Sequence, residues 1–291
     1  MNRDGQLQIE PRLHDLGDGF SVRRLLPFRQ RRHVGPFVFF DHIGPVDLAP
    51  GRGMDVRPHP HIGLATVTYL FDGAIRHRDS LGSDRVIRPG DVNWMTAGRG
   101  IVHSERTPAL ERAAGHRLHG LQTWVALPRE QAEVPPEFLH HEADSLPQVE
   151  RDGVQLRVIA GSAFGMQSPV QVFAPTLYVE VRMRAGTRLS VPAEHAERAI
   201  YVLGGELQVD AAPLPPQRML VVDHAAAIEL SARSAVHLFL CGGAPLDGER
   251  VLWWNFVASD RARIERAKAD WLAQRLGQVP GESEFIPLPE Y

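Results

Sequence analysis

Short runs of apolar and β-branched residues alternate with turn signals between residues 34 and 127. The run Leu64–Phe71 is rich in β-branched and aromatic residues, and the turn signal Asp72-Gly73 follows it. Arg88–Asp91 (Arg-Pro-Gly-Asp) is a second turn, in which proline presets a central position. Because no helical periodicity interrupts this series, the pattern predicts a small β-sandwich or barrel.

A second series of predicted strands extends from about Val154 to Phe256. It contains a short echo of the first series, because Tyr69–Ile75 resembles Tyr201–Leu207. Proline and charged residues interrupt the strand pattern between the two series. We therefore expect a first barrel in residues 1–130, an inter-barrel connection in residues 131–153 and a second barrel in residues 154–291.

Apolar residues at helical spacing predict one helix near the C-terminus, beginning near Asp260, with a stripe that docks on a barrel. The stripe consists of Ile264, Ala267, Trp271 and Leu272. Ser259 is the expected N-cap of this helix, and Gly277 is the expected stop. The proline-containing residues 279–291 are expected to form an extended strap along the surface.

The composition is typical of a soluble globular protein: of 291 residues, 43% are hydrophobic and 23% are charged. The formal net charge is −3 and the cations are scattered, which argues against direct nucleic-acid binding. The single cysteine, Cys241, excludes an internal disulfide and a thiolate metal cluster. No signal-peptide pattern or membrane-length apolar run is visible, so we expect a cytoplasmic protein without membrane contact.

The 14 histidines change the picture, because histidine is the commonest metal ligand. His59 and His61 are two residues apart, so on a strand both side chains face the same side. His103 and Glu105 repeat this spacing with a carboxylate in second place. Each motif alone also fits solvent-exposed side chains. Together they predict three nitrogens and one carboxylate oxygen that converge inside one barrel.

Such a ligand set suits a divalent transition metal, namely Fe, Mn, Co, Ni, Cu or Zn. Calcium and magnesium prefer all-oxygen sites and are disfavoured. Four protein ligands on an octahedral ion leave two neighbouring positions open, as an oxygen-activating or substrate-chelating site requires.

Several motifs together strongly resemble the pirin family of the cupin superfamily. The most specific is the run Trp94–Glu105 (Trp-Met-Thr-Ala-Gly-Arg-Gly-Ile-Val-His-Ser-Glu). The others are His59–His61, Thr66–Tyr69, His77–Gly82, Leu118–Gln122, Trp253–Val257, Pro280–Glu282 and Glu284–Glu290. The resemblance covers nearly the whole chain. It implies an all-β fold of two tandem cupin (jelly-roll type) barrels, with a C-terminal helix and an extended tail.

The resemblance also implies one metal ion, usually iron, in the first barrel. The implied ligands are His59, His61, His103 and Glu105. One departure is visible at Ala65, where pirins commonly carry a glutamate that is not a ligand. We expect this change to affect the surroundings of the metal or the pocket mouth.

The second barrel is expected to lack a complete metal site. Val191 and Ala193 stand where the first barrel has its histidine pair. His195 and Glu197 lie nearby but out of register, and we interpret them as surface residues.

Other histidines leave alternatives open. His77 and Asp79 are two residues apart on a predicted strand, and they either line the metal pocket or form a polar outer face. His140 and His141 lie in the expected connection and are predicted to be solvated.

Some pirins resemble flavonol 2,3-dioxygenases, which open the central ring of quercetin. We therefore expect an oxidoreductase with Fe(II) as cofactor and a small aromatic substrate such as a flavonol. A flavonol offers its 3-hydroxyl and 4-carbonyl to two open metal positions, and Glu105 is the expected proton carrier.

The alternative function is regulatory. In it, the iron is a redox sensor whose state is read by a partner protein, either a transcription factor or a metabolic enzyme. A structural cupin with vestigial activity is a third option, because a fold alone does not define a function. In each case we expect a monomer.

Overall fold

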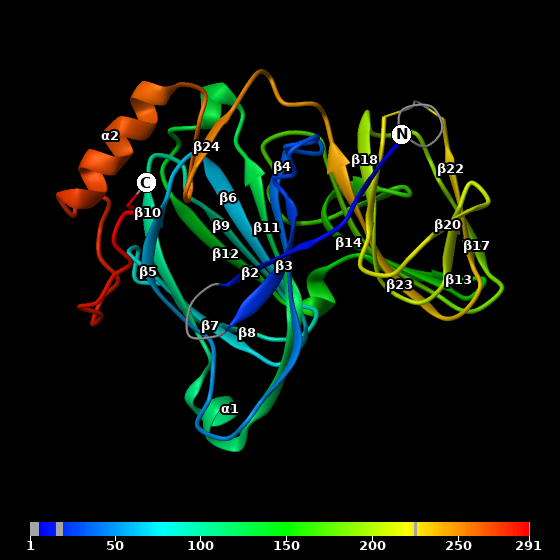
Figure 1. Cartoon of the computed structure of the whole chain (residues 1–291), viewed down its shortest axis with the longest axis horizontal. Helices are drawn as coiled ribbons and strands as arrows, with labels where there is room; N and C mark the ends of the chain where they lie inside the picture. Colours follow the sequence, from blue (N-terminus) through cyan, green and yellow to red (C-terminus); the bar gives the residue numbers. More distant parts are fainter. Residues whose placement is uncertain (1–5, 16–19, 224–225, 291) are drawn as a thin grey trace. The chain divides into compact units, whose positions relative to one another are not determined.

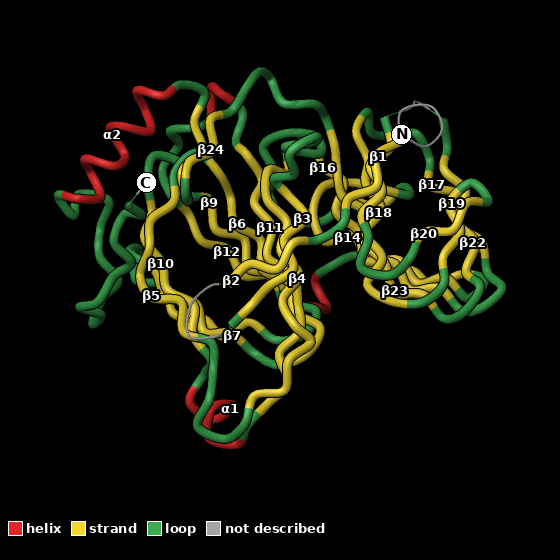
Figure 2. The backbone as a smooth tube through the Cα atoms, viewed as in Figure 1, coloured by secondary structure: helices red, strands yellow, loops and turns green. Residues whose placement is uncertain are grey.

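The computed structural model describes residues 6–15, 20–223 and 226–290, and nearly all its regular structure is antiparallel strand. The strands form two compact units, each with two main sheets (Figure 1). Figure 2 shows how little of the chain is helical. Short β-branched and aromatic runs separated by turns explain why strands dominate. The expected all-β fold of two cupin barrels is confirmed.

The first barrel contains the sheet that carries the candidate ligands. This sheet has the order β5 (Asp55–His61), β10 (Ile101–Arg106), β7 (Ile75–Asp79) and β8 (Asp84–Ile87). The other sheet has the order β12 (Glu137–His141), β9 (Val92–Thr96), β6 (Leu64–Asp72), β11 (His116–Ala126), β4 (Phe37–Leu48), β3 (Ser21–Leu26) and β2 (Arg12–Asp15). The short helix α1 (Ala109–Ala114) connects β10 to β11. Buried apolar side chains from both sheets, together with Met54 just before β5, form one core cluster: Val22, Ile43, Met54, Leu70, Ile75, Ile87 and Leu118.

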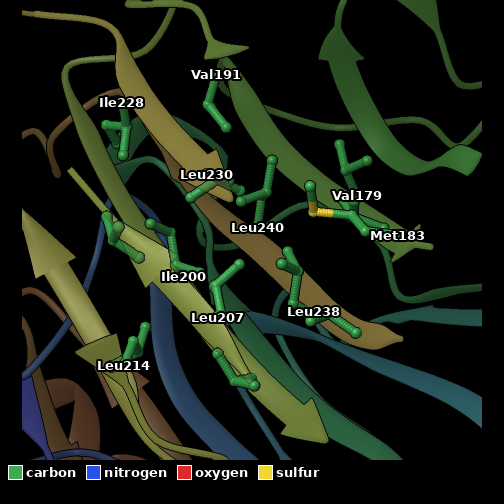
Figure 3. Close-up of a cluster of buried hydrophobic side chains, with 14 of the residues drawn as sticks. Val179, Met183, Val191, Ile200, Leu207, Leu214, Ile228, Leu230, Leu238 and Leu240 are labelled. Atoms are coloured by element: carbon green, nitrogen blue, oxygen red, sulfur yellow. The ribbon is translucent and has the colours of Figure 1, made fainter. Parts of the chain in front are cut away.

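The second barrel is built in the same way from later strands. Its larger sheet has the order β1 (Gln6–Ile9), β21 (Met219–Val222), β18 (Glu197–Gly204), β23 (Val236–Gly243), β16 (Thr176–Met183), β14 (Val154–Ala163) and β13 (Gln148–Arg151), with β15 (Met166–Gln167) beside β14. Its smaller sheet has the order β17 (Arg188–Val191), β22 (Ile228–Ala232), β19 (Leu207–Val209) and β20 (Ala212–Leu214). Figure 3 shows valine, leucine, isoleucine and methionine side chains packed together between these strands.

The two units do not follow the boundaries expected from the sequence. Strand β12 lies within the expected connection, yet it pairs with β9 and extends a sheet of the first barrel. Strand β13 lies there too and pairs with β14 of the second barrel. The one-turn helices η1 (Arg129–Gln131) and η2 (Ala143–Ser145) flank β12. Nearby prolines make both segments look like loops in the sequence. Composition also does not indicate which sheet edge a short strand pairs with.

The C-terminal segment Leu246–Tyr291 also belongs with the first barrel, although we expected it with the second. The hairpin of β24 (Val251–Trp253) and β25 (Phe256–Ala258) leads into helix α2 (Arg261–Leu272). Buried side chains of α2 share one apolar cluster with Ile62 and Val102 of the first barrel. Burial of this stripe explains why the segment stays on that barrel (Figure 1).

The ends of α2 differ from the expected ones. Asp260, rather than Ser259, is the N-cap, and its side chain accepts a hydrogen bond from the Arg263 backbone N–H at 2.8 Å. The helix ends at Leu272, before Gly277, and Leu272 is 72% exposed, so it is not part of the docking stripe. Within the described ranges, neither α-helix is both long and apolar enough to cross a membrane.

Candidate metal centre

The four predicted ligands come from two neighbouring strands of the first barrel. His59 and His61 lie at the end of β5, while His103 and Glu105 lie on β10. The antiparallel register places His103 directly opposite His59. The three histidines are at most 6% exposed, so they face the barrel interior. The alternative of solvent-exposed histidines is therefore wrong.

The three histidines form a group that can hold a metal ion, because one ligand nitrogen from each lies within 4.8 Å of the other two. His59 Nδ1 is hydrogen-bonded to the Arg57 carbonyl at 2.9 Å, which leaves its Nε2 for a ligand. Nδ1 of His61 and Nε2 of His103 are buried and have no hydrogen-bond partner. Buried nitrogens in this state are costly unless another group engages them, and a neutral three-imidazole set fits a divalent transition metal.

Burial also keeps these three rings neutral. It lowers the pKa of His59 to about 4, against a hydrogen bond to the Arg57 backbone that raises it. Burial lowers the pKa of His61 and of His103 well below the ordinary value, and charge repulsion from His59 adds to the effect. Neutral imidazole is the form that binds metals, so the rings need not lose a proton first.

Glu105 lies beside this group but is not one of its three mutually close members. Its Oε1 accepts a hydrogen bond from Thr68 Oγ1 at 3.3 Å, and Thr68 Oγ1 is 2.7 Å from Gln122 Oε1. Burial raises the pKa of Glu105, while the electrostatic interaction with His77 and the Thr68 hydrogen bond oppose that rise. A bound cation would favour the ionised carboxylate. The ligand role of Glu105 stays a prediction.

The two polar residues of β7 face the same site. His77 and Asp79 are 3% and 0% exposed. His77 Nδ1 is 3.3 Å from His103 Nδ1, and His77 Nε2 is 3.0 Å from Asp79 Oδ2. The polar outer face is therefore the wrong alternative. Strand alternation in the sequence gave both residues one face, but it could not distinguish the inner face from the outer one.

Two aromatic residues next to the site were missed in the sequence. The Trp124 ring meets the His61 ring edge-on, with centroids 5.1 Å apart. Phe138, on β12, stacks on His77 with a centroid distance of 4.2 Å. Phe138 lies within the expected connection of residues 131–153, and no pattern in that segment indicates that β12 pairs with β9 of the barrel.

Ala65 faces away from the metal site. On β6, Thr68 contacts Glu105, and alternation therefore puts Thr66 on the site face and Ala65 on the opposite one. Its partner Val125 lies next to Trp124, which is the residue that contacts His61. The expectation that Ala65 alters the surroundings of the metal is not supported by this geometry.

The second barrel has no comparable group in its described residues. Val191 is part of its apolar core. His195 is 9% exposed, with Nε2 2.8 Å from the Ser162 carbonyl oxygen, so it is not the surface residue we expected. Glu197 accepts a hydrogen bond from the Gly35 backbone N–H at 2.6 Å. Both side chains thus have structural partners.

His140 is also not the solvated residue expected. It lies on β12, and its Nδ1 is 2.7 Å from Asn93 Oδ1 on the neighbouring strand β9. Its environment is that of an edge strand of the first barrel.

Two cupin-type barrels with one buried three-histidine group define a bicupin with a single candidate metal centre in the described residues. The pirin family model matches residues 19–125, and the model for the pirin C-terminal cupin domain matches residues 178–277. The chain belongs to the pirin family.

Individual relatives agree with this assignment. The chain is 49% identical to a pirin-like protein of Caulobacter vibrioides, over 98% of this chain and 99% of that protein. It is 31% identical to human pirin, over 91% of each chain. Among solved structures, it is similar to quercetin 2,3-dioxygenase from Acinetobacter baumannii, with a TM-score of 0.92 and 35% identity, over 99% of this chain and 96% of that one.

Proposed function

We propose that this protein is a mononuclear iron dioxygenase of the quercetin 2,3-dioxygenase type. The buried three-histidine group carries the proposal, because it offers neutral nitrogen ligands and leaves coordination positions free. The similarity to the Acinetobacter baumannii enzyme supports the choice of a flavonol as substrate. The proposed setting is the cytoplasm, with the protein acting as a monomer.

In this proposal His59, His61, His103 and Glu105 would hold Fe(II), which would supply one-electron chemistry and bind a chelating substrate. The side chain of Glu105 accepts the proton of the flavonol 3-hydroxyl. Burial raises the pKa of this carboxyl in the metal-free protein, whereas a bound cation would favour its ionised form, which is the form that accepts a proton. Thr68 orients this carboxyl through its hydrogen bond to Oε1. The burial of the histidines limits access of water to the reaction.

The test is oxygen uptake by anaerobically purified, iron-loaded protein in the presence of quercetin. We expect slow, iron-dependent oxygen consumption, cleavage of the central ring and release of carbon monoxide. Glu105→Gln preserves size and one oxygen, so it should retain some metal and lose turnover. Glu284→Gln, at a carboxylate 53% exposed on the C-terminal tail, is the matched control and should keep full activity.

The regulatory alternative predicts a different outcome. Iron-loaded protein would bind quercetin without turnover, and its affinity for a partner protein would change between Fe(II) and Fe(III). That pair of results would replace the dioxygenase with a redox-sensing regulator.

A further inference from the structure

A chain of three buried side chains runs from β10 to β7 and ends on a carboxylate. His103 Nδ1 is 3.3 Å from His77 Nδ1, and His77 Nε2 is 3.0 Å from Asp79 Oδ2. The three residues are at most 3% exposed, so water does not compete for these contacts. His103 is one of the candidate metal ligands, whereas the other two residues are not in the three-histidine group.

The carboxylate fixes the direction of every hydrogen bond in this chain. An ionised carboxylate only accepts, so His77 Nε2 must donate to Asp79. In a neutral ring the other nitrogen then has no proton, so His77 Nδ1 accepts, and His103 Nδ1 is the donor. The remaining nitrogen of His103, Nε2, consequently bears a lone pair. This is the buried nitrogen that lacks a hydrogen-bond partner.

We propose that His77, held by Asp79, is a positioning residue that selects the metal-binding tautomer of His103. The proposal rests on the metal-binding part of the proposed function and not on the identity of the substrate. His77 does not touch the metal or the substrate in this role. It acts through the hydrogen bond that it accepts from His103.

The surroundings hold His77 and Asp79 rigidly enough for such a role. The His77 ring stacks on Phe138 with centroids 4.2 Å apart and an interplanar angle of 9°. Asp79 Oδ1 accepts hydrogen bonds from the backbone N–H groups of Leu81 and Ser83, at 2.9 and 3.0 Å. These bonds leave Oδ2 directed at His77. The backbone of the turn therefore fixes Asp79, and the stacked Phe138 ring restricts the orientation of His77.

The variant Asp79→Asn distinguishes tautomer selection through hydrogen bonds from an effect of side-chain packing. The amide is nearly the same size, and its oxygen can still accept from the two backbone groups. Its NH2 then faces His77 Nε2, which must become an acceptor. The proton of neutral His77 moves to Nδ1, so His103 Nδ1 must accept and His103 Nε2 carries the proton. The ligand lone pair is lost although no ligand has been changed.

Two substitutions at His77 complete the test. His77→Phe keeps a ring to stack on Phe138 but removes both hydrogen bonds. His77→Gln supplies an amide oxygen for His103 and an NH2 group for Asp79, so it retains the donor and acceptor order. We therefore expect His77→Gln to rescue what His77→Phe loses.

The experiment measures Co(II) affinity by competition with a chelator and records the visible absorption spectrum of the bound Co(II), using the full-length protein. Asp79→Asn and His77→Phe should each weaken Co(II) binding by about 10- to 100-fold and alter the spectrum. His77→Gln should remain within a few-fold of wild type. Circular dichroism checks that each variant is folded.

Wild-type affinity and an unchanged spectrum in folded Asp79→Asn would overturn the proposal. Equal losses in His77→Gln and His77→Phe would also overturn it, because packing rather than hydrogen-bond order would then matter. If His77→Phe does not fold, the comparison of Asp79→Asn with His77→Gln still decides. Suppose that wild-type protein binds Co(II) but that its iron-loaded form does not turn over quercetin. The dioxygenase function would then be wrong, and this inference would still stand.

Discussion

His103 and His59 lie directly opposite each other in the antiparallel register of β10 and β5, and their ring centroids are 4.4 Å apart. Two motifs that are far apart in sequence thus meet as a cross-strand pair. Strand pairing brings them together beside the apolar core of the first barrel, and we expect that core, rather than a metal ion, to supply most of the folding free energy.

His103→Ala should therefore remove most of the bound metal and leave the fold intact. The lost side chain is 1% exposed, so the metal-free variant should lose about 1–3 kcal/mol of unfolding free energy through the cavity. Elemental analysis after iron reconstitution checks the metal, and circular dichroism checks the fold.

His195→Ala, in the second barrel, is the matched control and should leave about one metal per chain. A stoichiometry of two metals in wild type would contradict the single site. Global unfolding of metal-free His103→Ala would instead make the metal structural.

Glu282 connects the C-terminal tail to the outer face of the ligand-bearing sheet. Its carboxylate accepts hydrogen bonds from Ser104 Oγ at 2.7 Å and from Arg106 Nη2 at 2.8 Å, and it pairs with Arg78 at 3.1 Å. Burial raises the pKa of Glu282, but these hydrogen bonds and charges outweigh it and hold the pKa below its ordinary value.

A carboxyl whose pKa is lower in the folded state contributes stability above its unfolded pKa, and this contribution is lost as pH falls through the folded pKa. Glu282→Gln should therefore cost about 1–3 kcal/mol at pH 7 and flatten the loss of stability on acidification below about pH 4.5. Thermal melts between pH 7 and pH 3 measure both effects. Glu284→Gln, at an exposed position, should change stability by less than about 0.5 kcal/mol, and an equal effect at both sites would refute the argument.

The sequence predicted the fold class and the three-histidine group because both depend on local spacing. Alternation along a strand sets the face of His59 and His61, and one motif match sets their partner His103. The residues around the site depend on strand pairing, which the spacing of residues along the sequence does not indicate. Phe138 reaches His77 only because β12 pairs with β9, and no pattern in a proline-rich segment indicates that edge.

Element boundaries were the weaker part of the prediction for a related reason. Helix α2 follows the predicted apolar spacing through Trp271, but the final position depends on which turn still touches the barrel. Leu272 is next in sequence and points away. Helical periodicity defines a stripe, whereas tertiary contact decides where the stripe ends.

Trp271→Ala should consequently destabilise the first barrel's unit by about 3–5 kcal/mol. The indole is 2% exposed, its Nε1 donates to the Ile286 carbonyl at 3.0 Å, and its ring meets Phe285 edge-on. Urea unfolding measures the loss. Leu272→Ala is the control on the same helix and should cost less than about 0.5 kcal/mol. Similar costs at the two positions would mean that α2 does not dock through this stripe.

Cys241 should be unreactive in the folded protein and fully reactive on unfolding. The thiol is 0% exposed, and burial raises its pKa to about 12. Since the thiolate is the reactive form, both the burial of the thiol and its raised pKa suppress the reaction in the folded protein. Labelling with a maleimide, with and without denaturant, checks this directly, because the chain has one cysteine. Stoichiometric labelling of the native protein within minutes would show that the second barrel opens readily.

Ala65→Glu should destabilise the protein without changing its metal site. Ala65 is 0% exposed, and alternation along β6 directs its side chain away from the face that Thr68 shares with Glu105. A glutamate there would overpack the core and remove its carboxylate from water, which should lower the free energy of unfolding by about 3 kcal/mol or more. Ala65→Leu adds volume without charge and should cost about 1–3 kcal/mol, so the difference between the variants reports desolvation.

The same Co(II) titration separates stability from binding. Molecules of Ala65→Glu that remain folded should bind Co(II) with wild-type affinity and give the wild-type spectrum. The reason is that the introduced carboxylate lies on the face of the β6 sheet that points away from His61 and His103. Denaturant unfolding supplies the folded fraction needed for the comparison. A stable variant with an altered Co(II) spectrum would place the side chain at position 65 near the metal, and the alternation of β6 would then have to be shifted by one residue.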